Sequence, residues 1–294
     1  MNKVISIVGP TGVGKTKLSI ELAKKLNGEI INADSTQIYK ELNIATAKVT
    51  TKEMEGIKHY LIDFKDINDD YNVYNYQSDC RKCIETIKNN KKVPIIVGGT
   101  GLYIKAALYN YEFNNEEDFE SFENLSNDEL YEKLIQVDPN TKIHKNNRKR
   151  VIRSLNFYLN NKRPQSENSG SNKLLYDTIF IGLTLDRENL YNIINNRVDK
   201  MLSNGLIEEA KLLYDRKIYS KAVMTPIGYK ELFEYFDKKI TLEEAIILIK
   251  QRSRKYAKRQ YTWFKNQMSV KWFEVDRKNF NNTVNLVYDY IKKQ

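Results

Sequence analysis

One segment near the start of the chain has the residue types and spacing of a phosphate-binding loop. It runs Gly9-Pro10-Thr11-Gly12-Val13-Gly14-Lys15-Thr16 and matches the pattern G-x-x-x-x-G-K-[ST]. In such a loop the backbone N–H groups surround a di- or triphosphate, the lysine adds a positive charge, and the last hydroxyl can ligate Mg²⁺. We therefore expect this loop to bind a phosphorylated small molecule, with Thr16 as a metal ligand. A glycine-rich turn without a ligand is the alternative.

Asp34 and Thr100 form a second candidate group, because each follows a segment that is typical of a buried strand. In an open parallel sheet, ligands bind beyond the carboxyl ends of the strands, so both residues should face the phosphate loop across one crevice. A carboxylate there can bind a metal or accept a proton from an attacking nucleophile, and it can also cap a helix. Spacing alone leaves these roles of Asp34 open.

Two basic segments are candidates for contact with a polyanion. A predicted helix over Leu242–Lys265 places six cations on one side: Arg252, Arg254, Lys255, Lys258, Arg259 and Lys265. A second cluster comprises Arg148, Lys149, Arg150 and Arg153. The chain has 48 Lys and Arg against 38 Asp and Glu, a net charge of +10 that favours nucleic acid as a partner. Solvated helix faces in a basic proteome would give the same pattern.

The elements that must position these groups alternate between strands and helices. Val4–Val8, Glu29–Ala33, His59–Asp63 and Val93–Val97 are predicted strands, and helices are expected after the phosphate loop, over 74–89 and over 102–108. This alternation predicts an α/β fold: a parallel sheet flanked by helices, like that of P-loop NTPases.

The character of the chain changes near residue 111. We expect a helical insertion domain over residues 111–177, with residues 1–110 and 178–294 forming the catalytic core. Ser126 and Glu129 form a capping box that opens one helix of the insertion, and Asp138-Pro139 is predicted to start another. A strand over 178–183, mostly helices after it and a last strand over 270–275 complete the prediction.

The cysteines and the distribution of apolar residues bear on metal binding, redox chemistry and membrane insertion. Cys80 and Cys83 have no second pair and few histidines to complete a metal site, so two helix thiols without a zinc or redox role are expected. We find neither a membrane span nor a leader segment, and we expect a cytoplasmic monomer.

Together these motifs resemble the tRNA dimethylallyltransferases, also called the isopentenyl-tRNA transferase family, in their bacterial form. The match covers nearly the whole chain in order. It comprises the phosphate loop, Asn32-Ala-Asp-Ser-Thr-Gln-Ile-Tyr39, Ile44-Ala-Thr-Ala-Lys48, His59-Tyr-Leu-Ile-Asp63, Val97-Gly-Gly-Thr-Gly-Leu-Tyr103, Asp186-Arg-x-x-Leu, Arg197-Val-Asp199, Ile227-Gly-Tyr-Lys-Glu231 and Lys258-Arg-Gln-x-Thr-Trp-Phe264.

The resemblance implies transfer of a dimethylallyl group from dimethylallyl diphosphate to N6 of adenosine 37 in tRNA, with Mg²⁺ as the cofactor. It makes Asp34 the proton acceptor, with Thr100 beside it, and assigns Lys15 and the loop to the leaving diphosphate. Residues implied to contact tRNA, in the anticodon stem-loop, are Asp34, Ser35, Thr36, Gln37, Thr100, Lys149, Arg150 and Arg153. The basic helix face adds Arg254, Lys258 and Arg259 to that prediction.

Departures from the family pattern leave one contact open. Some members have arginine where Thr225 aligns here, so Arg254 or Arg259 would have to supply an arginine to the diphosphate. The chief alternative function is a small-molecule or nucleotide kinase, in which the loop binds ATP. Kinases of this class usually hold Mg²⁺ with a strand-end acid, whereas Gly98 follows Val93–Val97 here. A non-catalytic RNA-binding protein is a weaker alternative, because Lys15, Thr16 and Asp34 are all present.

Overall fold

The computed structural model describes residues 3–111, 120–167 and 173–294. The chain divides into two compact units. The larger one comprises Met1–Leu108 with Tyr176–Gln294, and the smaller one comprises Tyr109–Leu175. The expected insertion, residues 111–177, differs from the smaller unit by two residues at each end.

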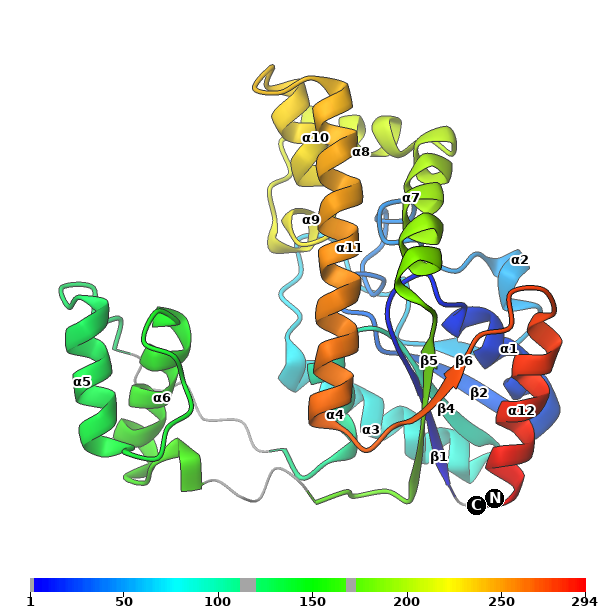
Figure 1. The fold of residues 1–294 in the computed structure, drawn as a ribbon, viewed down its shortest axis with the longest axis horizontal. Coiled ribbons are helices and arrows are strands. Elements are labelled where there is room, and N and C mark those ends of the chain that lie inside the picture. The colour runs from blue at the N-terminus through cyan, green and yellow to red at the C-terminus, as the bar shows by residue number, and fades with distance from the viewer. Residues whose placement is uncertain (1–2, 112–119, 168–172) are drawn as a thin grey trace. The chain divides into compact units, whose positions relative to one another are not determined.

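Six strands of the larger unit form an all-parallel sheet (Figure 1). In chain order they are β1 Val4–Val8, β2 Gly28–Asn32, β3 His59–Tyr60, β4 Val93–Val97, β5 Thr178–Thr184 and β6 Lys271–Glu274. Their order across the sheet is β3-β2-β4-β1-β5-β6. The predicted α/β fold with a parallel sheet is confirmed, although the third strand ends at Tyr60 and not at Asp63.

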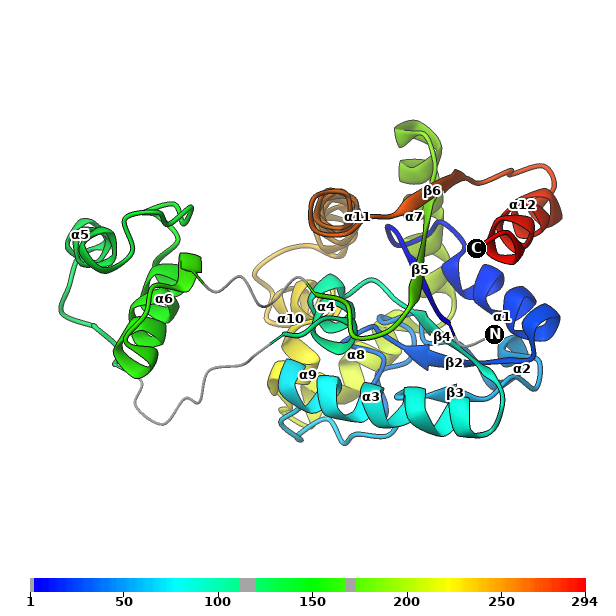
Figure 2. The ribbon, with the colours of Figure 1, turned by 90° about the horizontal axis from the view of Figure 1, so that it is seen from below.

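Helices cover both faces of this sheet. The helices of the larger unit are α1 Lys15–Leu26, α2 Thr51–Met54, α3 Val73–Asn89, α4 Gly101–Leu108, α7 Arg187–Ser203, α8 Leu206–Asp215, α9 Lys221–Met224, α10 Tyr229–Phe236, α11 Leu242–Gln267 and α12 Phe280–Lys292. Of these, α8, α9 and α10 lie beyond the carboxyl ends of the strands (Figure 1). Helices α1 and α12 pack together on one side, and α3 and α4 pack together on the other (Figure 2). Because both faces are covered, Ile5, Ile7, Ile95 and Ile181 are fully buried, which explains the continuous apolar runs in the sequence.

The register of the central strands brings three loops to one edge. Ile7 of β1 and Asn32 of β2 both pair with Val97 of β4, so the three strands end at the same level. Strand β1 leads into the phosphate loop, β2 leads into Asp34, and β4 leads into the glycines at 98 and 99. The loops that carry the candidate chemistry therefore start side by side at the carboxyl edge of the sheet.

The smaller unit has a core of its own, formed by α5 Asn127–Val137 and α6 Arg148–Asn161, with a short 3₁₀ helix, η1 Gln165–Glu167. The capping box at Ser126 is confirmed at the start of α5. The predicted helix start at Asp138-Pro139 is wrong, because a turn follows instead. The Asp138 carboxylate is buried and accepts hydrogen bonds from the backbone N–H and the hydroxyl of Ser166.

None of the helices in the described part of the chain is long and apolar enough to cross a membrane.

Candidate active site

The phosphate loop has a backbone that its glycines make possible. Gly9 has φ +139°, and a Cβ there would lie 2.6 Å from the carbonyl oxygen of Leu183. Gly14 has φ +93° and immediately precedes α1. Left-handed backbone is accessible to glycine without steric cost, so the loop can turn sharply and present the N–H groups at the start of α1 to an anion.

Lys15 is held over this loop by two backbone carbonyls. Its Nζ donates hydrogen bonds to the oxygens of Gly9 (3.0 Å) and Pro10 (2.8 Å). Burial, and after it the nearby positive charge of Arg197, lower the pKa of the Lys15 ammonium to about 7, although the Asp34 carboxylate opposes both effects. The loop therefore contains a cation whose charge is poorly compensated until an anion binds.

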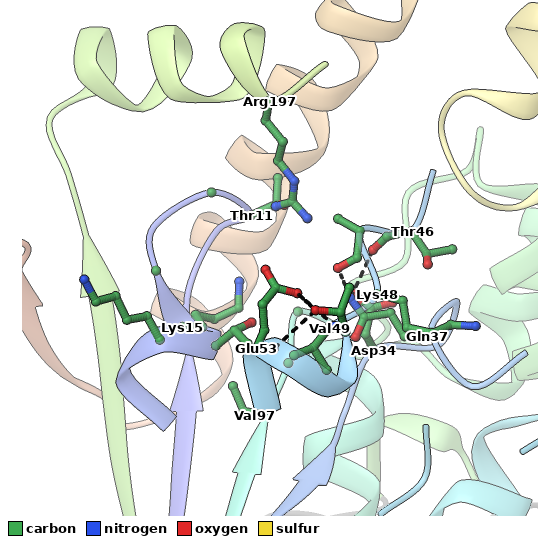
Figure 3. Close-up of a pocket in the computed structure, with 18 of the residues that line it drawn as sticks. Thr11, Lys15, Asp34, Gln37, Thr46, Lys48, Val49, Glu53, Val97 and Arg197 are labelled. Atoms are coloured by element: carbon green, nitrogen blue, oxygen red, sulfur yellow. Dashed lines mark hydrogen bonds between the residues drawn. The ribbon is translucent and has the colours of Figure 1, made fainter. Parts of the chain in front are cut away.

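Arg197 of α7 completes the cationic side of the site. Its Nη1 donates to Thr11 Oγ1 (2.8 Å), and Figure 3 shows the guanidinium reaching toward Thr11. Burial lowers the pKa of Arg197, while Asp34 and Glu53 raise it. We did not predict this role from the sequence, where Arg197 entered only as part of a family motif. One feature of the sequence could have indicated this role. Arg197 is a cation on the apolar side of the helix, close to Ile194 and Val198, and both of these residues are buried.

Arg254 and Arg259, the two arginines that we expected to contact the diphosphate, lie elsewhere. Arg254 donates to Asn195 Oδ1 (2.6 Å) and its guanidinium lies 5.9 Å from the centre of the Tyr191 ring. Arg259 is exposed and lies over the Tyr256 ring. Neither arginine lines the cavity that the loop faces, and Thr225 does not line it either. Of the residues that the structure describes, Arg197 is the arginine beside the loop.

Asp34 forms a tight turn and caps no helix. Its Oδ1 accepts hydrogen bonds from the backbone N–H (3.0 Å) and the hydroxyl (2.7 Å) of Thr36, and residues 35–37 are bends and turns. The helix-cap alternative is therefore wrong. Since Oδ1 is occupied by Thr36, Oδ2 is the oxygen left to act on a ligand. Asp34 lines the same cavity as Lys15 and Arg197.

Thr100 supports this turn from the neighbouring strand end. Its Oγ1 accepts a hydrogen bond from the Ser35 N–H (3.0 Å) and donates one to Ser35 Oγ (3.2 Å), and its own N–H donates to the Ala33 carbonyl (3.1 Å). Thr100 is not among the residues that line the cavity. Its contacts orient the residues on either side of Asp34.

A loop from Asn43 to Lys48 forms another wall of the cavity, and Glu209 of α8 holds it in place. The Glu209 carboxylate accepts hydrogen bonds from the N–H groups of Asn43, Ile44 and Ala45, and from the Tyr229 hydroxyl. Gln37 is bound to the same loop, because its Nε2 donates to the carbonyls of Thr46 and Ala47. The tRNA contacts predicted for Ser35, Thr36 and Gln37 stay predictions.

These groups surround one cavity of about 930 Å³ (Figure 3). Residues of the phosphate loop that line it are Thr11, Gly12, Gly14, Lys15 and Thr16, whereas Gly9, Pro10 and Val13 form the loop behind them. Asp34 and Gln37 line the same cavity, and so do the apolar side chains of Ile44, Val97 and Ile193. The cavity can therefore hold an anion and an apolar group together, next to a carboxylate.

The described residues contain no group of three or more His, Cys, Asp or Glu side chains arranged to hold a metal ion. Thr16, the predicted Mg²⁺ ligand, lies in the first turn of α1 and lines the cavity. Any metal there would need oxygen ligands from a bound phosphate as well, which is the usual coordination of Mg²⁺.

The basic helix face is less free than the sequence indicated. Arg252 forms an ion pair with Glu231 of α10, and Arg254 is bound to α7, as described above. Lys255, Lys258, Arg259 and Lys265 are exposed.

In the smaller unit the basic residues of α6 divide in the same way. Arg148 donates to the carbonyls of Phe122 and Leu125, so it has a structural role. Lys149, Arg150 and Arg153 are exposed, and none of the three forms an ion pair within the described residues. Their predicted contact with tRNA stays a prediction.

Comparison with known proteins agrees with this geometry. Residues 37–267 match the IPP transferase family model. The chain is 49% identical to a tRNA dimethylallyltransferase from Anoxybacillus flavithermus, over 99% of this chain and 96% of the relative. It is 50% identical to a tRNA dimethylallyltransferase from Geobacillus kaustophilus, over 93% of this chain and 90% of the relative.

Two solved structures have the same architecture. One is a tRNA delta(2)-isopentenylpyrophosphate transferase from Staphylococcus epidermidis, with 44% identity, a TM-score of 0.76 and coverage of 100% of this chain and 99% of the other. The second is a eukaryotic dimethylallyltransferase acting on tRNA, with 32% identity, a TM-score of 0.86 and coverage of 100% and 80%.

Proposed function

The chain belongs to the IPP transferase family, and on that basis we propose that it transfers a dimethylallyl group from dimethylallyl diphosphate to N6 of adenosine 37 in tRNA. One observation in the structure supports the proposal most strongly. A phosphate loop and a strand-end carboxylate, Asp34, line the same partly apolar cavity. The strand that would carry the acid of a phosphate-loop ATPase, β4, is followed instead by Gly98. Such a site is suited to a diphosphate leaving group and to a nucleophile that loses a proton.

The proposed reaction forms one bond and breaks one. The N6 lone pair attacks C1 of the dimethylallyl group, the C1–O bond breaks, and its electron pair leaves with the diphosphate. The amine then loses one proton, and Oδ2 of Asp34 accepts it. The adenine must leave its stack to reach this carboxylate, as target bases do in other enzymes that modify nucleobases.

The cationic side of the cavity would stabilise the negative charge that gathers on the diphosphate. Backbone N–H groups of the loop, Lys15 and Arg197 all lie on that side. Fixed donors and charges in a site that excludes water stabilise such a transition state strongly. Exclusion of water also protects the activated allyl group from hydrolysis.

We propose that Mg²⁺ enters together with the diphosphate. The chain offers the Thr16 hydroxyl but no cluster of acidic ligands within its described residues, so the ion would be held mainly by diphosphate oxygens and water. When bound, it would neutralise part of the diphosphate charge. Calorimetry with MgCl₂ alone should then show no binding, and Thr16→Val should weaken binding of Mg²⁺-pyrophosphate more than binding of pyrophosphate alone.

Contact with the anticodon stem-loop is assigned to Lys149, Arg150 and Arg153 of the smaller unit and to Lys258 and Arg259 of α11. All five are exposed cations, which suits contact with a phosphate backbone. Arg254 is the weakest of the predicted tRNA contacts, since Asn195 already binds its guanidinium. A cytoplasmic, monomeric enzyme is part of the same proposal.

Asp34→Asn tests the proposed function. Asparagine keeps an oxygen that can accept the Thr36 N–H and removes the base, so the transfer rate to unmodified tRNA should fall about 10²–10⁴-fold. Pyrophosphate affinity and tRNA affinity should stay within a few-fold. Unimpaired turnover by the variant would remove Asp34 as the base, and no transfer by the wild-type protein would refute the function.

A further inference from the structure

Gln260 of α11 contacts two of the loops that form the site. Its Oε1 accepts a hydrogen bond from the N–H of Thr11 (2.8 Å), and its Nε2 donates one to the carbonyl of Gly99 (3.1 Å). The side chain is 5% exposed. A single amide therefore connects the phosphate loop after β1 to the glycine loop after β4.

The fit between α11 and the glycine loop is close. A Cβ on Gly99 would lie 2.0 Å from Nε2 of Gln260, and a Cβ on Gly101 would lie 2.1 Å from Cε3 of Trp263. Glycine at both positions lets the helix touch the backbone there. The position of the glycine loop therefore depends on the side chains that α11 presents to it.

Each loop that Gln260 holds leads to one partner in the proposed reaction. Thr11 receives the Arg197 guanidinium on its hydroxyl, so it belongs to the side that holds the diphosphate. Gly99 precedes Thr100, whose hydroxyl binds Ser35 next to Asp34. The amide of Gln260 thus stands between the leaving-group side and the acceptor side of the cavity, and Gln260 also lines that cavity.

A side chain that merely fills space would not need both functions of an amide. The Thr11 N–H requires an acceptor and the Gly99 carbonyl requires a donor, and of the residues of similar length only glutamine offers both. A purely structural role would lower stability when Gln260 is replaced, but it would not affect turnover selectively.

We propose that Gln260 is a positioning residue that sets the separation between the diphosphate and the base, Asp34. This inference rests on the proposed function. Reacting atoms must approach to about 3–3.5 Å in a reactive complex, and a misplacement of about 1 Å can cost about 10²-fold in rate. The amide fixes that separation without touching either reacting group.

Gln260→Met is the direct test, because methionine keeps the length and removes both hydrogen bonds. The kcat for transfer should fall about 10²-fold, while KM for dimethylallyl diphosphate stays within about threefold, since the N–H groups of residues 12–16 remain free to bind phosphate. Gln260→Glu keeps the acceptor for Thr11 and loses the donor to Gly99, so its kcat should lie between those of Gln260→Met and wild type. Gln251→Met, at an exposed position of the same helix, is the control and should match wild type.

Amide hydrogen exchange supplies a readout that does not depend on activity. Exchange in Gln260→Met should rise in both loops, residues 9–14 and 98–101, and not elsewhere in the sheet. A lower melting temperature with unchanged kcat would overturn the proposal, as would unchanged exchange in either loop. If the wild-type protein transfers no prenyl group, the proposed function fails and this role in catalysis with it. Faster exchange of both loops in Gln260→Met would in that case still show that Gln260 connects them. Failure of the proposed function can therefore be distinguished from failure of the Gln260 proposal.

Discussion

Lys15 of the phosphate loop gives a sharp prediction, because its charge changes near neutral pH. In the free protein, burial and the positive charge of Arg197 lower the pKa of Lys15 to about 7. A bound diphosphate would place negative charge beside this ammonium and restore its charged form. Diphosphate binding above pH 7 should therefore be accompanied by proton uptake.

The size of the effect follows from the pKa. At pH 8 a group with a pKa of about 7 is about nine-tenths deprotonated, so binding should take up about 0.9 proton, against about 0.1 at pH 6. The protonated form is the one that binds, so affinity falls as pH rises. Above pH 8 it should fall about tenfold per pH unit from this group, which is about 1.4 kcal/mol.

Calorimetric titration with inorganic pyrophosphate measures this uptake. Titrations at pH 6 and pH 8, each in two buffers with different enthalpies of ionisation, give the number of protons taken up. Lys15→Met is the matched control, because pyrophosphate contributes its own protons equally in both proteins and the difference isolates Lys15. Equal proton numbers for wild type and Lys15→Met at pH 8 would refute the reasoning.

Three further predictions concern residues around the site. Arg197→Gln should weaken pyrophosphate binding about 10–100-fold, because a hydrogen bond to a charged group contributes about 1.5–3 kcal/mol; it should also move the Lys15 transition to higher pH. The double variant Arg150→Glu, Arg153→Glu should weaken tRNA binding and flatten its logarithmic salt dependence by about 1.8, or about 0.9 for each lost phosphate contact. Glu209→Gln should lower the free energy of unfolding by about 1–3 kcal/mol in denaturant titrations, since an amide oxygen cannot accept all three loop N–H groups.

Each of these predictions has a clear contrary result. Unchanged pyrophosphate affinity in Arg197→Gln would show that the guanidinium serves only Thr11. Parallel salt slopes for wild type and the double variant would show that the α6 cations are a solvated face. Glu208→Gln is the control for Glu209→Gln, because its side chain is exposed on the same helix. Equal unfolding energies for these two variants would mean that the loop does not depend on the carboxylate.

The parts of the fold that the sequence predicts are those determined locally. Strand β1, the phosphate loop and α1 follow from apolar runs and glycines whose backbone demands are local. Helix α11 was predicted from Leu242 to Lys265 and ends at Gln267. The helix that was wrongly predicted to start at Asp138 shows the limit of such reasoning. The Asp138 carboxylate binds Ser166, which lies far along the chain.

The site shows the same division. Lys15 could be found from the phosphate-loop motif, and Asp34 could be found because it closely follows the end of its own strand, β2. Arg197 could not be assigned, because it reaches Thr11 from a distant helix. Gln260 likewise needs the packing of α11 against two loops before its two hydrogen bonds can be seen. Tertiary contacts of this kind leave little trace in local patterns.

Transfer of a dimethylallyl group to adenosine 37 is tested most directly by mass spectrometry of nucleosides from tRNA that was unmodified at the start of the reaction. The tRNA is incubated with the protein, Mg²⁺ and dimethylallyl diphosphate, beside a control tRNA with guanosine at position 37. We predict N6-(dimethylallyl)adenosine in the first tRNA only, and its loss when Asp34→Asn replaces the wild-type protein. Absence of the modified nucleoside, with ATP consumed against a small acceptor instead, would contradict the account and support a kinase.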